Sequence, residues 1–335
     1  MVSIVVLTHN RKRLLAKCLA SLFAQDWPRN DYEIIVADDG STDGTGELVR
    51  ELDAPEPHLR YVWQHRRGVA GARNLGLRHA RGAWISFVAD DYELAPDYIR
   101  TAMRLFAEQP DRLVVRFKVV AAGADFGSRV SGLYYELGAI RRLGVWGVER
   151  RPWKIARALA RYQVRPTEDH GLEPAGAACF RREVFDRAGW FDEGLERGED
   201  TEFGVRLRGH GIPIYYYPRH EIRHHLEPYP WPALAKAYRS GRYRFRYYLY
   251  NRHGGAASDG KPPGWLALGL EKAAAAAGLA VYCYRHRILT RVALLSPLLA
   301  SIEAANKLGF VWEALRSSRR PPFRAAEPCS YTERD

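Results

Sequence analysis

The side chains best suited to chemistry stand directly after three short apolar runs, residues 4–7, 33–37 and 84–88. In chain order they are Thr8, Asn10, Arg11, Asp38, Asp39, Asp90 and Asp91. Carboxylates that share a site repel one another unless a cation or hydrogen-bond donors offset their charge. Oxygen ligands suit Mg²⁺ or Mn²⁺, and these ions bind through one or two carboxylates together with substrate phosphates. The cluster therefore predicts a site for a metal–nucleotide complex.

These side chains can meet only if the apolar runs are neighbouring strands. Such runs alternate with helical patterns in the first third of the chain, and Asn10 stands where it can cap the first helix. The expected strands are 4–7, 33–37, 59–63, 84–88 and 114–117, with a further strand at 212–217. Repeated β–α units predict an α/β fold with a mostly parallel, doubly wound sheet. Ligands of such a sheet bind beyond the carboxyl ends of its strands, where the acids lie.

Composition limits the partners and the compartment. The 335 residues carry a formal charge of +12 and are 47% hydrophobic, which favours a folded chain that meets phosphates, an anionic membrane surface or nucleic acid. Four scattered cysteines favour a reduced, cytoplasmic setting over a disulfide framework. No leader pattern and no uncharged apolar run of about 18 residues is found, so we expect a cytoplasmic protein, peripheral at the inner face of the membrane at most.

Several segments resemble, in order and spacing, the inverting glycosyltransferases of family two, whose nucleotide-sugar-binding fold is called GT-A. They are residues 5–11 (VVLTHNR), 33–45 (EIIVADDGSTDGT), 68–74 (GVAGARN), 82–91 (GAWISFVADD), 189–193 (GWFDE) and 198–207, which begins GED. The resemblance spans about residues 2–225. It implies a donor half at 1–120 and an acceptor and catalytic half at 121–228. A basic, Ala/Leu-rich helical extension at 229–316 and a loose tail at 317–335 would follow.

The resemblance also implies roles for individual side chains. Asp91 would hold Mn²⁺ or Mg²⁺ on the donor diphosphate, with His224 as a further ligand for which His220 and His225 compete. Asp200, preceded by Glu199, would be the catalytic base. The acceptor would meet Trp190 and Asp192. The residues expected to bind the nucleotide sugar are Thr8, Asn10, Arg11, Asp38, Asp39, Arg73 and Asp90.

One departure from the family pattern keeps other interpretations open. The family usually has an acid where this chain has Ala89, which supports a non-catalytic sugar- or nucleic-acid-binding module. A nucleotidyltransferase would also use a metal–nucleotide complex, but it needs a glycine-rich basic signature after the first strand. Glu199 and Asp200 could also merely favour the start of a helix. Our interpretation is transfer from a UDP-sugar to a hydroxyl of a glycan or lipid-linked acceptor, with a membrane surface as partner and without nucleic acid.

The basic, aromatic stretch 239–252 is the part of the extension expected to meet lipid headgroups, and helices through 265–299 could rest on the bilayer. The sequence carries no signal for an oligomeric state.

Overall fold

The structure is a computed structural model that describes residues 1–52, 58–123, 125–132, 167–169, 176–195, 197–226, 230–252 and 289–317. The predictions for the irregular segment 133–166, for the helices through 265–288 and for the tail beyond 317 lie outside these residues. The boundaries at 120, 228 and 316 stay predictions.

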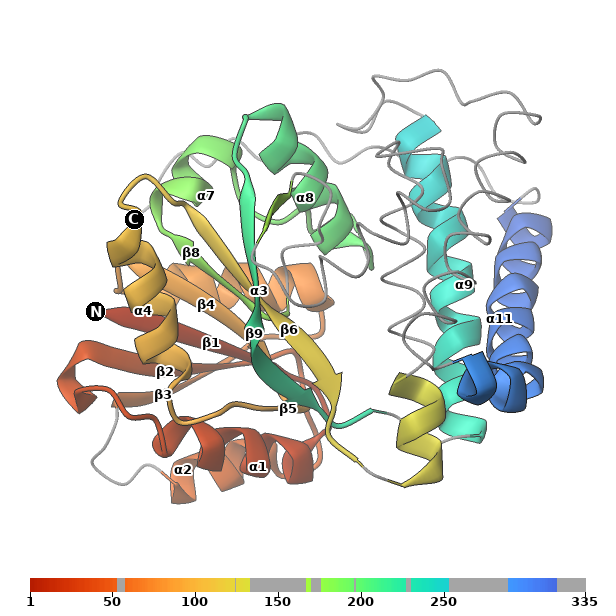
Figure 1. Cartoon of the computed structure of the whole chain (residues 1–335), viewed down its shortest axis with the longest axis horizontal. Helices are drawn as coiled ribbons and strands as arrows, with labels where there is room; N and C mark the ends of the chain where they lie inside the picture. Colours follow the sequence, from red (N-terminus) through yellow and green to blue (C-terminus); the bar gives the residue numbers. More distant parts are fainter. Residues whose placement is uncertain are drawn as a thin grey trace.

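A single mixed sheet forms the centre of the larger part of the molecule (Figure 1). In the described residues its strands follow the order β3-β2-β1-β4-β8-β6-β9-β5, and β7 pairs with β9. The strands are β1 (Val2–Thr8), β2 (Tyr32–Asp38), β3 (His58–Trp63), β4 (Trp84–Ala89), β5 (Tyr92–Glu93), β6 (Val114–Ala121), β7 (Thr167–Asp169), β8 (Ala178–Arg181) and β9 (Ile214–His224). The first four along the order are mutually parallel, as the alternating pattern predicted, whereas β8 is antiparallel to both β4 and β6.

Helices cover both faces of the sheet, so the strands β1, β2 and β4 are buried on both sides. One apolar core gathers side chains of α1, α2 and α4, and the other gathers those of α3, α7 and α8. The helices are α1 (Lys12–Phe23), α2 (Thr45–Glu51), α3 (Val69–His79), α4 (Tyr98–Glu108), α7 (Glu183–Ala188) and α8 (Glu199–Gly209). The doubly wound α/β architecture is therefore as expected.

Two details of the sequence prediction are wrong. Asn10 does not cap α1, because it takes a positive φ of 52° and its Oδ1 accepts a hydrogen bond from the Thr42 amide instead (2.7 Å). The strand expected at 212–217 runs on to His224 as β9, so its end pairs with β5, close to the residues that follow β4. Both differences concern contacts between segments far apart in the chain, which local pattern does not reveal.

The C-terminal helices α9 (Trp231–Arg252) and α11 (Leu289–Ser317) stand side by side, apart from the helices that cover the sheet (Figure 1). They run parallel, because Ala237 packs with Ile302 and Phe245 packs with Phe310 further along both helices. Gly241 and Gly309 lie so near the facing backbone that a methyl group on either would overlap it. Within the described ranges, no helix has the length and apolar character needed to cross a bilayer.

Candidate active site

The parallel register brings the predicted donor residues to one rim of the sheet. Thr8 at the end of β1 lies beside Asp38 at the end of β2, and Leu7 of β1 pairs with Ala89 at the end of β4. Asp90 therefore follows the sheet edge directly, and the Thr8 hydroxyl donates a hydrogen bond to its Oδ2 (2.9 Å). The side chains of Thr8, Asp38 and Asp90 are at least nine-tenths buried, so their positions are fixed before any ligand arrives.

The two acids after β2 are held by different sets of donors. Asp38 accepts hydrogen bonds from the Tyr61 hydroxyl (2.6 Å) and the Ser41 amide (2.8 Å). Asp39 accepts three, from the Gln64 side chain (2.9 Å) and from the amides of residues 67 and 68 (both 2.8 Å). A carboxylate with several donors is stabilised in its charged form. Asp39 thus ties the loop 64–68, between β3 and α3, to the rim.

The acid pair after β4 is bridged by a guanidinium. Arg11 Nη1 donates to Asp90 Oδ1 (3.2 Å) and to Asp91 Oδ2 (2.7 Å). Burial raises the pKa of Asp90 to about 6; the charge of Asp91 adds to the rise and that of Arg11 opposes it. The pair therefore shows the repulsion expected of adjacent acids, and a positive charge already compensates it.

Asp91 also meets two basic side chains from the C-terminal part of the chain. His224, at the end of β9, places its Nε2 3.3 Å from Asp91 Oδ2. Burial by itself would raise the pKa of Asp91, but the hydrogen bond and charge of His224 lower it below the ordinary value. The charge of Lys236, on α9, acts in the same direction. The helical extension therefore contributes positive potential to the rim.

The second acid pair begins helix α8. Gly198 takes a left-handed conformation (φ 89°) that starts the helix, and Glu199 then turns into the core. Arg73 of α3 pairs with it through Nη1 and Oε1 at 2.5 Å, with only 6% and 5% of the two side chains exposed. Asp200 is half-buried instead, and its Oδ1 accepts a hydrogen bond from the Thr201 amide (2.8 Å). Glu199 is thus bound internally, whereas Asp200 lies at the surface of the helix start.

Tyr92 joins the two acid pairs in space. Burial raises the pKa of its phenol, and the charges of Asp91 and of Asp200 raise it further. Arg73 acts on the same phenol in the opposite direction. The acids after β4 and at the start of α8 therefore act electrostatically on the same side chain, although about a hundred residues separate them in the sequence.

Hydrogen bonds with the side chain of Asn74 hold the loop that is expected to meet the acceptor. Asn74 donates through Nδ2 to the Phe191 carbonyl and to Glu193 Oε1 (both 2.9 Å), and its Oδ1 accepts from the Phe191 amide (3.1 Å). Trp190 and Asp192 on this loop are half-buried. Their side chains stay predictions as acceptor contacts, but the backbone that carries them is held by a buried amide.

The profile of the family described as glycosyl transferase family 2 matches residues 3–189, more than half of the 335 residues. The chain belongs to glycosyl transferase family 2. The matched region holds the rim acids and ends just before Trp190, so α8 and β9 lie beyond it.

Several curated proteins have similar sequences. Validoxylamine A glucosyltransferase of Streptomyces hygroscopicus subsp. jinggangensis (strain 5008) is 30% identical over 234 residues, which cover 64% of this chain and 53% of that protein. The uncharacterized glycosyltransferase EpsJ of Bacillus subtilis (strain 168) is 27% identical, covering 76% and 71%. Chondroitin synthase of Escherichia coli is 33% identical, covering 68% and 34%. The chain thus spans about half the length of the first of these relatives and about a third of the last.

Solved structures share the fold. Mannosyltransferase PcManGT from Pyrobaculum calidifontis, in complex with GDP-Man and Mn²⁺, aligns with a TM-score of 0.57 and 23% identity, covering 93% of this chain and 87% of that one. Residues 1–349 of TarS from S. aureus align with a TM-score of 0.50 and 18% identity, covering 95% and 92%. The predicted GT-A fold of this family 2 chain is confirmed.

The structure separates the three histidines that competed for the metal site. His225 contacts Glu93 (Nε2 to Oε2, 3.2 Å), and the buried His220 lies 3.6 Å from Asp97. His224 is the one beside Asp91. Of the three histidines, His224 therefore stays the predicted metal ligand beside Asp91.

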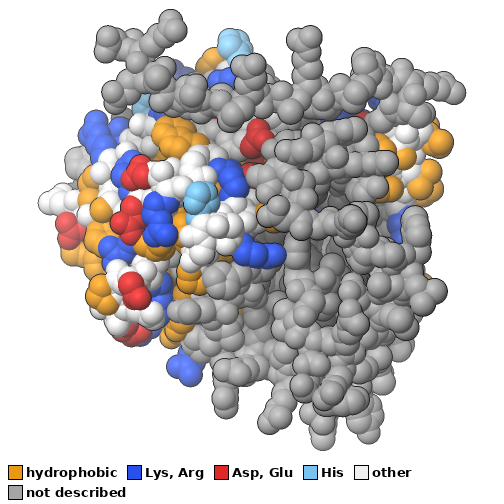
Figure 2. Space-filling model, turned by 90° about the horizontal axis from the view of Figure 1, so that it is seen from above, with side chains coloured by type: hydrophobic (Ala, Val, Ile, Leu, Met, Phe, Trp, Pro, Cys, Tyr) orange, Lys and Arg blue, Asp and Glu red, His pale blue; other side chains and the backbone are white. Residues whose placement is uncertain are grey.

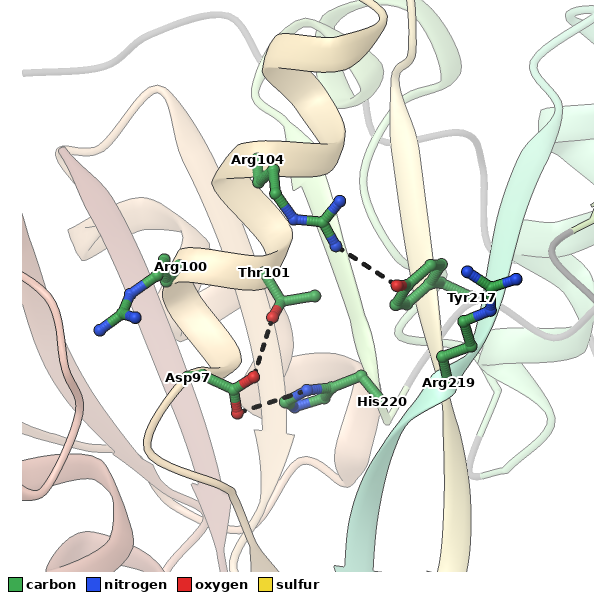
Figure 3. Close-up of a pocket in the computed structure, with 7 residues that line it drawn as sticks. All are labelled: Asp97, Arg100, Thr101, Arg104, Tyr217, Arg219 and His220. Carbon is green, nitrogen blue, oxygen red and sulfur yellow. Dashed lines mark hydrogen bonds and ion pairs between the residues drawn. The ribbon is translucent and has the colours of Figure 1, made fainter. Parts of the chain in front are cut away.

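A cavity of about 270 Å³ lies away from the rim, between α4 and β9 (Figure 3). Its lining consists of Asp97, Arg100, Thr101, Arg104, Tyr217, Arg219 and His220. Side chains already meet across it, since Arg104 donates to the Tyr217 hydroxyl (3.3 Å) and His220 Nδ1 lies 3.6 Å from Asp97 Oδ1. Burial lowers the pKa of His220, although nearby acids oppose this. Apart from His220, which competed with His224 for the metal, none of the residues predicted to bind donor, metal or acceptor lines this cavity.

Sequence reasoning missed the supporting residues of the site. Asn74 and Tyr61 are ordinary members of a helix and a strand by pattern, and Lys236 sits in a stretch that is notable only for being basic. For Asn74, the available signal was its position next to Arg73 in the motif at residues 68–74. Nothing in the local pattern points to Lys236, because its approach to Asp91 depends on where α9 packs.

Proposed function

We propose that this family 2 chain transfers a sugar from a nucleoside diphosphate donor to a hydroxyl acceptor with inversion at the anomeric carbon. The observation that carries the proposal is the buried row of Thr8, Asp38 and Asp90 at adjacent strand ends, with Asp91 paired to His224 beside it. Structures that share the fold hold UDP-GlcNAc, or GDP-Man and Mn²⁺. A UDP-sugar is the donor that we propose.

In this proposal different side chains of the rim bind different parts of the donor. Thr8, Asp38 and Asp39 bind the base and ribose, with Asn10 and Asp90 alongside. Arg11 lies 2.7 Å from Asp91 and can share the charge of the diphosphate. Lys236, whose charge already acts on Asp91, adds positive potential from α9. Arg73 acts on the donor pocket indirectly, because its guanidinium is bound to Glu199.

Asp91 and His224 are the residues that would hold a divalent cation. The described residues contain no group of three or more His, Cys, Asp or Glu side chains arranged for a metal. A pair of protein ligands still fits Mg²⁺ or Mn²⁺, since these ions take much of their coordination from substrate phosphates and water. When bound, the cation offsets negative charge on the departing diphosphate. Turnover measured with each ion in turn distinguishes Mn²⁺ from Mg²⁺.

Asp200 is the proposed base. As the acceptor oxygen forms its bond to the anomeric carbon, its proton passes to the Asp200 carboxylate, and the bond between that carbon and the diphosphate oxygen breaks. The electron pair of the broken bond leaves with the nucleoside diphosphate. Asp200 suits the role because it is half-buried at the start of α8, whereas its neighbour Glu199 is bound to Arg73. A positioned carboxylate contributes about 10²–10⁴-fold to such a step.

A matched pair of variants tests this assignment. Asp200→Asn should lower the release of nucleoside diphosphate from a panel of UDP-sugars by about 10²-fold or more, with donor binding retained. Asp186→Asn is the control, because Asp186 is an exposed acid in the first turn of the neighbouring helix α7. It should behave as the parent protein. Undiminished turnover by Asp200→Asn would refute the base. Release of pyrophosphate from a nucleoside triphosphate and a sugar 1-phosphate, without turnover of the UDP-sugars, would indicate a nucleotidyltransferase.

The acceptor that we propose is a glycan or a lipid-linked saccharide, and the product a cell-surface polysaccharide or glycolipid. The name of the chondroitin synthase relative is in keeping with this class. The proposed setting is the cytoplasm, with the enzyme peripheral at the inner face of the membrane.

A further inference from the structure

Helix α11 carries an exposed apolar stripe. Leu308, Val311, Trp312 and Leu315 follow one another at helical spacing, so they share one side of the helix. Their exposed fractions are 64%, 52%, 54% and 65%. The opposite side packs on α9 and holds the buried Ile302 and Glu313. Single exposed apolar residues are normal on a protein surface, whereas four large ones together on one helix face form a patch that calls for a partner.

The charges around this stripe are all of one sign. Lys307 and Arg316 flank the stripe and are exposed. From residue 297 to residue 316, every exposed position on α11 is apolar or basic. Glu313 is turned inward, where Arg242 (2.7 Å) and Arg246 (2.8 Å) of α9 bind it. Figure 2 shows orange side chains with blue among them at its right edge, where α11 lies in Figure 1.

The same ion pairs concern the basic stretch of the extension. The basic stretch 239–252 was expected to meet lipid headgroups, yet Arg242 and Arg246 are directed at Glu313, and Phe245 packs edge to face on Phe310 at 5.1 Å. These side chains hold α9 to α11. They are thereby engaged within the protein, and the outer face of α11 is a further surface with the composition for lipid contact.

We propose that the stripe Leu308–Val311–Trp312–Leu315 docks on the surface of an anionic lipid bilayer, with Lys307 and Arg316 at the headgroups. A helix with one apolar face and basic flanks lies in the plane of the interface, and tryptophan is favoured at that depth. The overall charge of +12 adds attraction to anionic lipid. A second copy of the chain fits less well, because a twofold contact through this face would set Lys307 and Arg316 near their own counterparts.

This inference deepens the proposed location at the membrane but is independent of glycosyl transfer, since vesicle binding needs neither donor nor acceptor. The full chain is mixed with vesicles made of equal parts phosphatidylcholine and phosphatidylglycerol, and bound protein is measured by flotation. Binding should weaken about fivefold for each basic residue when phosphatidylglycerol is left out, and should fall with added salt.

Two variants locate the surface. Trp312→Glu should reduce vesicle binding about tenfold or more, because it removes a buried apolar contact and adds repulsion. Trp312→Leu should keep most of the binding. Trp231→Glu is the matched control: this tryptophan is 77% exposed at the far end of α9 and should be neutral. All three substitutions fall at exposed positions, and a thermal melt followed by circular dichroism checks that each variant folds.

Several results would overturn the proposal. They are unchanged vesicle binding by Trp312→Glu, an equal loss in Trp231→Glu, and binding that ignores both lipid charge and salt. A parent protein that sediments as a dimer and becomes a monomer on Trp312→Glu, without binding vesicles, would assign the stripe to a second copy. Loss of vesicle binding with normal release of nucleoside diphosphate would leave the proposed reaction intact, and the reverse result would leave the membrane surface intact.

Discussion

The buried pair of Arg73 and Glu199 connects α3 to the start of α8, where the proposed base Asp200 lies, and breaking it should be costly. With 6% and 5% of these side chains exposed, solvent cannot take over from a missing partner. Arg73→Met leaves the Glu199 carboxylate buried without its cation, and such a change costs about 3–5 kcal/mol. Glu199→Gln should cost less, since a neutral amide oxygen can still accept a hydrogen bond from Arg73. Because Asp200 is the next residue, both changes should also lower turnover more than donor affinity.

A double-mutant cycle measures the pair directly. Urea unfolding of the parent, both single variants and the double variant should give a coupling free energy of about 2 kcal/mol, as expected for a hydrogen bond between charged groups. Arg104 and Glu108 supply the control, because that pair is about half exposed on α4 and should couple by less than about 0.5 kcal/mol. If the buried pair couples no more strongly than the surface pair, Arg73 does not fix the start of α8 through Glu199.

Three further predictions follow from the same structure. Asp39→Asn should weaken UDP binding by about 1–3 kcal/mol in calorimetry, because an amide NH₂ would face donors that now serve a carboxylate; unchanged affinity would exclude Asp39 from the donor site. Hydrogen bonds and a nearby arginine hold the pKa of Glu33 below its usual 4.5 despite its burial, so its contribution to stability is present above that pH and is lost on acidification. The stability gap to Glu33→Gln, measured by urea unfolding, should therefore shrink as the pH falls from about 5 to about 2, and a constant gap over that range would contradict this. Gly241→Ala should destabilise α9 and α11 by about 1–3 kcal/mol, because its methyl would overlap the Asn306 carbonyl. Gly209→Ala, with open space around it, should be neutral or stabilising, and equal effects of the two in thermal melts would refute the packing argument.

The parallel half of the sheet and its rim could be predicted from the sequence because both depend on local order. A strand buried on both faces is a continuous apolar run, and the residue after such a run stands at the carboxyl end of the sheet wherever the strand lies. Thr8, Asp38 and Asp90 therefore fell at the rim by chain order, and the family resemblance could assign them a ligand. The helix beginning at Glu199 was visible for the same reason.

Only the tertiary structure decided which of these groups meet. That His224 rather than His220 or His225 adjoins Asp91 depends on the length and register of β9, which no periodicity records. Arg73, the partner of Glu199, is 126 residues away in the sequence. The face of α9 that is turned to α11 depends on Gly241 and Gly309, which permit the close packing of the two helices. The pattern along the chain indicates whether a residue is suited to a buried or an exposed position. Contacts across the fold depend instead on how whole elements pack. That packing determines which acids are bound internally and which lie at the surface.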